Sequence, residues 1–412
     1  MNLDNKTSLI NYIKRTFLIL ASCGIIGSIL MILVWCIPDS LIRPNVESAY
    51  EIFNTEGTEQ HDIKFISYFY GMKLVPDKDV MSTVLANDPD RSPIEKAMDI
   101  NGYSRYWHGY HVVLRPLLTF FNYGQFRYIL FTFFAFLIYG IVRELNKSFE
   151  KLHAGICFVI TLILNNFFAV PFSYHVSMAF LVAFTAMLVM LKKKGYLQDD
   201  LKSWSFYMLV GGITSYVDFL TTPIVTLGLP LLADLLWRIK KSESGLRENV
   251  ILIFRNSLSW GIGYVLVWAE KWVIGSLILK QNVLADSMAE AAEWQTNAFG
   301  QKYTFLSALA KNLACLLPFG GTAKELIPFL FIYLMVGICL IYLIIKNRTV
   351  IKGNIYKIIP LLIVAAFPYI WILLMHNHSG VHATFWVYRI QTVAVFGLVT
   401  SFNLALIKDN GD

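Results

Sequence analysis

The sequence predicts an all-α, polytopic integral membrane protein with about ten transmembrane helices. Three observations lead to this fold class. Hydrophobic residues make up 56% of the 412 residues and charged residues only 15%, a composition too apolar for a soluble chain of this length. Apolar stretches as long as a bilayer crossing recur along the whole chain. Finally, lysine and arginine are distributed unevenly between the loops that join those stretches.

Each predicted helix contains roughly 17–25 mostly apolar residues, as a bilayer core about 30 Å thick requires. The helices are expected near residues 17–37, 126–142, 154–171, 175–191, 204–219, 223–237, 257–279, 326–345, 358–375 and 386–407. Two pairs form tight hairpins that turn at 171–173 and 221–223, because a proline just past a helix end prevents the helix from continuing. No internal repeat is visible, so residues 1–412 are expected to form one transmembrane domain.

Basic residues gather on one side of the predicted membrane. Loops on the side of the N-terminus are rich in them, for example at 192–194 and 238–241. The three short turns on the other side, near Phe172, Thr221 and Ser379, contain none. Because cytoplasmic loops carry the excess of lysine and arginine, both termini are predicted to be cytoplasmic.

The net charge of +7 comes largely from these same loops. Their basic residues set the topology and meet anionic headgroups, so membrane lipid is an expected partner and nucleic acid is not. The five cysteines lie in or beside apolar segments at no metal-like spacing, and no disulfide is expected. No P-loop or G-x-S-x-G element occurs, so an ATP-driven pump and an α/β hydrolase have no support.

Two segments predicted to be extracytoplasmic, 38–125 and 280–325, are too long to be simple connectors. In the first, Tyr106, Trp107 and Tyr110 precede a leucine-rich stretch, which predicts a helix lying in the membrane interface with aromatic anchors. In the second, residues 288–294 predict a short helix.

Most histidines fall on the predicted outer side of the membrane. They are His61, His108, His111, His175, His376, His378 and His382. Four ionisable residues lie at membrane depth near the same side: Asp218, Glu270, Lys271 and Arg389. Such groups are costly in a bilayer and therefore line a cavity or pair with one another. The sequence favours a polar pocket that opens outward, and the alternative is an inter-helix salt bridge such as Asp218 to Lys271.

The segment 376–382 places His378 and His382 four residues apart. Histidines at this spacing bind zinc well only with a third ligand and supporting hydrogen bonds, so hydrogen bonding to a polar ligand or to helix ends is favoured over a metal. Arg389 follows in the last helix. Its guanidinium fork suits a phosphate or diphosphate, and the competing interpretation is an interfacial arginine that snorkels.

Two D-x-D patterns, at 77–79 and 88–90, match the motif that holds metal and nucleotide-sugar in soluble glycosyltransferases. Three-residue patterns recur by chance. Both patterns also lie on the predicted outer side, whereas nucleotide-sugars are cytoplasmic. Solvated turns are therefore expected at both places.

Four groups of residues together resemble bacterial membrane proteins associated with surface polysaccharide synthesis, with a layout similar to the GT-C glycosyltransferase superfamily. These groups are 105–110 with Leu114-Arg115-Pro116; 218–223 with 226–228; 261–264 with Trp268, Lys271 and Trp272; and 377–379 with His382, Tyr388 and Arg389. The resemblance spans most of the chain.

The resemblance implies hexosyl or pentosyl transfer from a polyprenyl-phosphate-linked sugar to an acceptor glycan or glycolipid on the outer leaflet. It also implies an acidic residue in the first outer loop, as catalytic base or metal ligand. The carboxylate candidates are Asp39, Glu47 and Asp62, together with Asp218. Asp39 matches the position best but has no acidic neighbour to complete a pair, so a divalent metal stays open as a cofactor.

Such a reaction needs a carboxylate to deprotonate the acceptor hydroxyl and cations to hold the leaving phosphate. The substrate-binding candidates are His108, His111, Arg115, His175, Lys271, His378, His382 and Arg389. Two rival functions remain: a polysaccharide polymerase, and a flippase or transporter for lipid-linked glycans. A transporter should show inverted repeats and helices broken near the midplane, for which only Pro223 and Pro230 are candidates.

Overall fold

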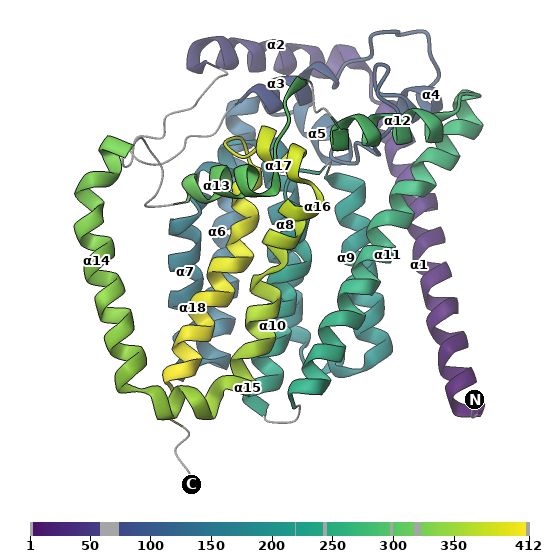
Figure 1. Ribbon diagram of the computed structural model, residues 1–412. Coiled ribbons are helices and arrows are strands. Elements are labelled where there is room, and N and C mark those ends of the chain that lie inside the picture. The colour runs from purple at the N-terminus through teal and green to yellow at the C-terminus, as the bar shows by residue number, and fades with distance from the viewer. Residues whose placement is uncertain are drawn as a thin grey trace.

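A computed structural model describes residues 3–57, 74–218, 220–241, 245–296, 300–316 and 323–408. Regular secondary structure in these ranges is helical throughout, with one isolated bridge between Ile100 and Tyr103. The long helices stand side by side as a bundle, and short helices cover one end of it (Figure 1). The all-α fold class is confirmed.

Every predicted apolar stretch contains a helix. The bundle helices are α1 (Leu3–Trp35), α6 (Tyr123–Ser148), α7 (Ala154–Leu164), α8 (Tyr174–Lys193), α9 (Asp200–Val217), α10 (Ile224–Lys241), α11 (Leu246–Leu279), α14 (Ala323–Lys346), α15 (Arg348–Ala365), its continuation α16 (Phe367–Leu374), and α18 (Thr392–Leu406).

Six helical segments of the described chain are long and apolar enough to cross a membrane: Leu9–Trp35, Tyr123–Ser148, Tyr174–Lys193, Leu246–Leu279, Arg348–Leu374 and Val387–Leu406. Two of the other predicted crossings are shorter apolar helices, Ala154–Leu164 and Tyr333–Lys346. The remaining two, α9 and α10, have 18 residues each. The structure therefore supports a helical membrane protein, and the full set of ten crossings remains a prediction.

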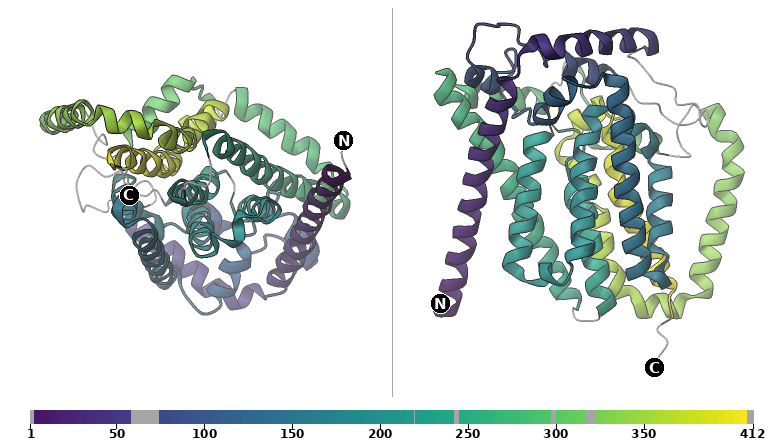
Figure 2. Two further views of the ribbon diagram at one scale, coloured as in Figure 1. Left: turned by 90° about the horizontal axis from the view of Figure 1, so that it is seen from below. Right: turned by 180° about the vertical axis from the view of Figure 1, so that it is seen from behind.

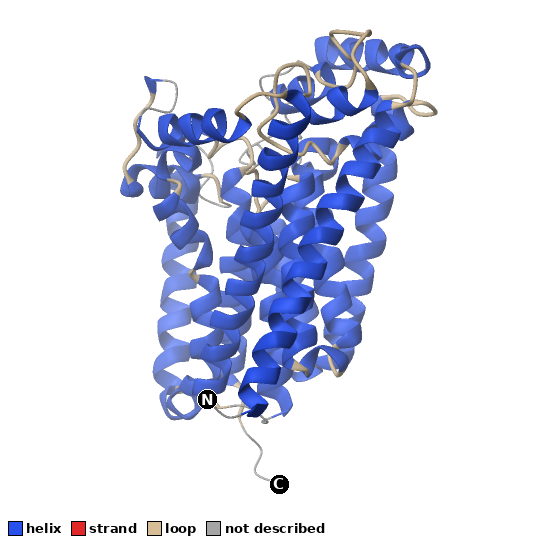
Figure 3. Ribbon diagram, turned by 90° about the vertical axis from the view of Figure 1, so that its right-hand side faces the viewer, coloured by secondary structure: helices blue, strands red, loops and turns tan. Residues whose placement is uncertain are grey.

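The short helices lie together at one end of the bundle, which we call the capped end (Figures 1 and 3). They are α2 (Asp39–Glu56), α3 (Val75–Ser82), α4 (Pro93–Met98), α5 (His111–Leu118), α12 (Val283–Thr296), α13 (Phe305–Ala314) and α17 (His376–Val381). Both chain ends lie at the opposite end, called here the terminal end (Figure 1). The two long segments thus fold over the same end, and α12 contains the helix predicted at 288–294.

Polar residues mark where several bundle helices begin. Asn122 and Gln125 form a reciprocal capping box at the start of α6, and the side chains of Ser173 and Asp199 cap α8 and α9. The predicted turn at 171–173 ends at Ser173, and the predicted turn at 221–223 directly precedes α10. Pro230 does not interrupt α10, which runs continuously from Ile224 to Lys241.

Helices α9 and α11 pack closely because glycines face the partner backbone. A Cβ atom on Gly211 would lie 2.1 Å from the carbonyl oxygen of Trp260, and one on Gly263 would lie 2.1 Å from that of Met208. Side chains larger than hydrogen would push the helices apart. The close contact holds α11, the helix that carries Lys271, against the centre of the bundle.

The aromatic residues predicted to anchor an interfacial helix lie inside the protein instead. Trp107 is completely buried, and its indole N–H donates a 2.6 Å hydrogen bond to the carbonyl of Val267 in α11. Tyr110 is also buried, and α5 begins only at His111. Trp107 packs against apolar residues of α1, α4 and α11, and Tyr110 packs against apolar residues of α2, α3 and α6. For these two rings, the prediction of an interfacial anchor is therefore wrong.

Candidate functional site at the capped end

Five aromatic side chains from distant parts of the chain meet at the capped end. They are His175 of α8, Trp294 of α12, His378 of α17, His382 just after α17, and Trp386, and we call them the histidine–tryptophan cluster. The imidazole of His382 stacks on the indole of Trp386, with ring centroids 4.4 Å apart. The rings of His175 and Trp386 lie 4.8 Å apart, as do those of His378 and His382. Trp294 lies within 5.4 Å of both His378 and His382.

Local sequence explains the alignment of three of the five cluster members. His378, His382 and Trp386 follow one another at intervals of four, and backbone bonds link them: His382 N–H to His378 O at 3.0 Å, and Trp386 N–H to His382 O at 3.2 Å. Side chains at this spacing lie on one face of a helical segment. His175 and Trp294 reach the same place only through packing of α8 and α12.

The cluster runs from the surface into the protein. Trp294 and His382 are half-buried, while His175, His378 and Trp386 are buried. Burial lowers the pKa of His378 to about 4. Burial also holds the pKa of His382 well below its usual value, and the positive charges that His378, His175 and Lys311 can carry lower it further. Both imidazoles are therefore neutral near pH 7 and act as hydrogen-bonding groups.

Arg389 lies one turn beyond Trp386 and is completely buried. Its Nη1 donates a 3.0 Å hydrogen bond to the carbonyl of Phe385, and its guanidinium carbon lies 4.5 Å from the ring centre of Tyr388. Nε and Nη2 are buried without a hydrogen-bond partner, and no carboxylate of the described residues forms an ion pair with this guanidinium. A buried charge without a partner is costly, which favours an anionic ligand at this point.

Other buried polar atoms without a partner surround this segment. They are Asn312 Oδ1, His378 Nδ1, Ser379 Oγ, His382 Nδ1, Trp386 Nε1 and Gln391 Oε1. The backbone here is nonetheless well held, because Asn312 Nδ2 donates to Ser379 O at 2.9 Å and Gln391 Nε2 donates to Asn312 O at 2.9 Å. Native proteins leave few buried polar groups unpaired, so the concentration of such groups makes this segment the candidate binding site.

Three contributors to the site were missed from sequence: Trp294, Lys311 and Trp386. Lys311 of α13 donates hydrogen bonds to Tyr303 Oη at 3.0 Å and to Gly380 O at 2.9 Å, beside the cluster. The spacing of Trp386 from the two histidines was a usable signal. Trp294 and Lys311 come from the second long segment, and no local pattern linked them to the site.

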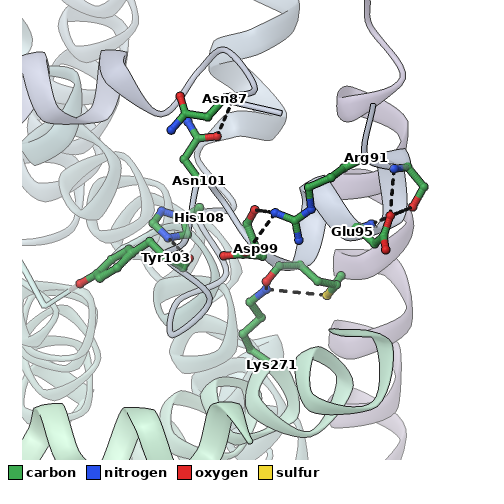
Figure 4. Close-up of polar contacts among 10 residues, drawn as sticks. Asn87, Arg91, Glu95, Asp99, Asn101, Tyr103, His108 and Lys271 are labelled. Carbon is green, nitrogen blue, oxygen red and sulfur yellow. Dashed lines mark hydrogen bonds and ion pairs between the residues drawn. The ribbon is translucent and has the colours of Figure 1, made fainter. Parts of the chain in front are cut away.

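His108 and His111 belong to a separate group near α11. His108 has a left-handed backbone, and its ring nitrogens lie 2.7 Å from Tyr110 Oη and 3.2 Å from Tyr103 O. Figure 4 shows His108 beside Tyr103. Burial lowers the pKa of His108 to about 3, and the charge of Lys271 adds to that effect. His111 Nε2 lies 3.2 Å from Thr83 Oγ1. Both histidines have partners within the chain and brace the first long segment.

Arg115 and Asp39 bind each other. Arg115 is completely buried, with Nη2 2.9 Å from Asp39 Oδ1, and it also donates to the carbonyls of Val34, Ile37 and Val84. Asp39 Oδ2 accepts a 2.8 Å bond from the backbone N–H of Ala86. This pair joins the end of α1 to the chain after α3. Among the other loop candidates, Glu47 is exposed on α2 and Asp62 lies outside the described residues.

Asp218 and Lys271 are both buried but do not bind each other. The carboxylate of Asp218 accepts hydrogen bonds from Thr221, through the backbone N–H at 3.1 Å and through the hydroxyl. Lys271 Nζ donates a 2.6 Å bond to the carbonyl of Met98 in the first long segment (Figure 4). The salt bridge considered from sequence is therefore absent between these two described residues, while Asp218 remains at the capped end of α9.

The solvated turn expected at 77–79 is wrong. Asp77 is 1% exposed within α3, and it accepts bonds from the hydroxyl of Ser173 and the backbone N–H of His175. Burial raises the pKa of this carboxyl group to about 6. Asp77 thus caps the first turn of α8 and positions His175, a long-range role that no local pattern indicates. Residues 88–90 do form an exposed turn.

Within the described ranges, no three histidine, cysteine, aspartate or glutamate side chains are grouped to hold a metal ion. An apolar groove of about 590 Å³ runs beside α18, between that helix, α15 and α14. Its walls include Leu340, Ile358, Leu398 and Phe402. Helix α14 stands apart from the bundle on this flank, whereas α1 lies on the opposite one (Figure 2).

Comparisons of the chain with protein-family models, with curated proteins and with solved structures gave no match in any of the three.

Proposed function

We propose that the protein is a membrane glycosyltransferase that moves a sugar from a polyprenyl-phosphate-linked donor to an acceptor glycan or glycolipid on the outer face of the bacterial cytoplasmic membrane. The observation that carries this proposal is Arg389, a buried guanidinium without an ion-pair partner among the described residues, next to a cluster of neutral imidazoles and indoles. A phosphate is the anion best matched to a guanidinium fork, and indole faces suit the apolar face of a sugar ring.

The apolar groove supports a lipid-linked donor. Leu398 in its wall follows Arg389 by nine residues, on the order of 13 Å along a helix. A donor with its phosphate at Arg389 would have an apolar channel along α18 for its polyprenyl chain.

In the proposed reaction, a carboxylate takes the proton of the acceptor hydroxyl while the hydroxyl oxygen bonds to the anomeric carbon. The bond from that carbon to the phosphate oxygen breaks, and the lipid phosphate leaves with the bonding electrons. Arg389 stabilises the charge that develops on the phosphate. We assign the base role to Asp218, which is buried and whose orientation Thr221 fixes. Asp77 is also buried, but its carboxylate caps the first turn of α8.

The distribution of basic residues supports an orientation with the terminal end in the cytoplasm and the capped end outside. A cysteine at position 88 should therefore react with an impermeant reagent in intact cells, and one at 198 should not. The reverse labelling pattern would mean that the capped end faces the cytoplasm, and it would contradict the proposal.

The test is sugar transfer by purified protein in nanodiscs from a panel of polyprenyl-phosphate hexoses and pentoses, with and without a chelator. Arg389→Lys should lose at least tenfold in turnover, because a point charge does not reproduce a bidentate fork. Arg247→Lys, at an exposed site on the terminal end of α11, is the matched control. Full activity in Arg389→Lys would contradict the phosphate role. Movement of intact lipid-linked glycan across the bilayer of sealed proteoliposomes, without transfer, would favour the flippase instead.

A further inference from the structure

A second group of buried and half-buried polar side chains lies in the half of the bundle near the terminal end, away from the histidine–tryptophan cluster. Its members come from three adjacent helices: Tyr207 of α9, Asp234 and Arg238 of α10, and Arg255 and Asn256 of α11. Tyr207 and Asn256 are completely buried and Asp234 is 2% exposed. The three helices pack against one another, and Arg255 Nε lies 3.4 Å from Asn256 Oδ1.

Each arginine uses only part of its guanidinium within the chain. Arg238 Nε lies 3.1 Å from Asp234 Oδ1, and Arg255 Nη1 lies 2.5 Å from Asp200 Oδ1. The Nη2 atoms of both arginines are buried and make no hydrogen bond to any residue that the structure describes. Ion pairs therefore balance the charges but leave a donor of each guanidinium unused.

Further atoms of the same group also have no partner. They are the hydroxyl of Tyr207, Nδ2 of Asn256 and Oδ2 of Asp234. Together with the two Nη2 atoms, this gives four donors and one acceptor. All five are in buried positions, where an unmade hydrogen bond costs on the order of 1–3 kcal/mol. Ion pairing of the helices alone does not explain why so many donors remain unused.

We propose that this group binds a phosphate group. Phosphate oxygens accept from several donors at once, and guanidinium forks suit them. A phosphate monoester can also carry one proton near neutral pH, which would bond to Oδ2 of Asp234. Two sources share this chemistry: the headgroup of a monophosphate lipid and free inorganic phosphate. The site is independent of the proposed transferase activity, because it lies near the other end of the bundle and its test measures binding.

The experiment is a native mass spectrometry titration of the full-length protein with phosphatidic acid, phosphatidylcholine and inorganic phosphate. Tyr207→Phe is the sharpest variant, since it removes a hydroxyl that makes no hydrogen bond within the chain and should leave folding unchanged. It should weaken phosphate binding roughly tenfold. Arg255→Gln should weaken it further, and Arg247→Gln, an exposed arginine on the same helix, should not.

Selective binding of phosphatidic acid identifies a lipid headgroup, and competition by inorganic phosphate identifies a site for the free anion. Either result, with loss in Tyr207→Phe, supports the proposal. Equal binding by wild type and Tyr207→Phe would overturn it, as would an equal loss in Arg247→Gln, which would reduce the effect to surface charge. Binding of phosphatidylcholine and phosphatidic acid with the same affinity would also overturn it.

Discussion

The carboxylate of Asp39 lies 2.9 Å from the guanidinium of Arg115, a side chain that is completely buried. Asp39 was the first-loop carboxylate that best matched the position of a catalytic base. In the folded chain it instead compensates the buried charge of Arg115 and accepts a hydrogen bond from the backbone N–H of Ala86. Its contacts describe a structural residue that ties the first long segment to α1.

Removing the charge of Asp39 should therefore reduce the stability of the protein rather than its transfer activity. Asp39→Asn leaves Arg115 buried with carbonyl partners only, a change expected to cost about 3 kcal/mol. Thermal unfolding in detergent should show a lower midpoint, with transfer activity per folded molecule retained. The control is Glu47→Gln, on an exposed face of α2, which should alter neither. Normal folding with complete loss of activity in Asp39→Asn would return Asp39 to the base role.

Asp218 should behave in the opposite way. Asparagine keeps an oxygen that accepts from Thr221, so Asp218→Asn should fold with a normal yield. It cannot take a proton from an acceptor hydroxyl, and turnover should fall by roughly 10²-fold or more. Thr221→Val, which removes the hydroxyl but keeps the backbone bond, should cause a smaller loss. An Asp218→Asn protein with wild-type turnover would exclude Asp218 as the base.

Acid should destabilise the protein through its buried histidines. His378 has a pKa of about 4 against an ordinary value of 6.5, so between these values the unfolded chain binds a proton that the folded chain does not. Stability is therefore lost as the pH falls from about 6.5 toward 4, by about 3 kcal/mol for this residue. Asp77, whose pKa is raised to about 6, works in the opposite direction over the same window.

The contribution of His378 is isolated by comparing wild type with His378→Gln in thermal unfolding between pH 7 and pH 4. The variant should lose less stability on acidification, because glutamine does not titrate. Parallel curves for the two proteins would show that His378 is not held neutral by burial.

The contact between α9 and α11 gives a test of the helix packing. Gly263→Ala should destabilise the protein by about 1–3 kcal/mol or more, because its Cβ would meet the Met208 carbonyl at 2.1 Å. Gly261→Ala is the matched control two residues away. Its Cβ would enter open space, and alanine should raise helix stability by up to about 1 kcal/mol. Relative to wild type, Gly263→Ala should lower the folded yield and the unfolding midpoint, whereas Gly261→Ala should raise them slightly. Similar changes in the two variants would argue against the close approach of α9 and α11.

The positions of the helices could be read from the sequence because they depend on local properties. Apolar runs, prolines at turns and capping residues such as Ser173 and Asp199 act over a few residues, and each predicted stretch contains a helix. Whether short or charged helices such as α7 and α10 cross a bilayer is less local, since neighbouring helices can shield their polar groups.

The sequence by itself determined the all-α class, the helix positions, and the spacing that aligns His378, His382 and Trp386. The tertiary structure alone decided which polar residues share a site, because burial and pairing depend on contacts between distant segments. In the folded chain, Asp39 forms an ion pair with Arg115, buried Asp77 accepts a hydrogen bond from the backbone N–H of His175, and Trp294 contacts the histidines. A charge pattern shows that an ionisable group must find a partner, and only the packed chain shows which partner it finds.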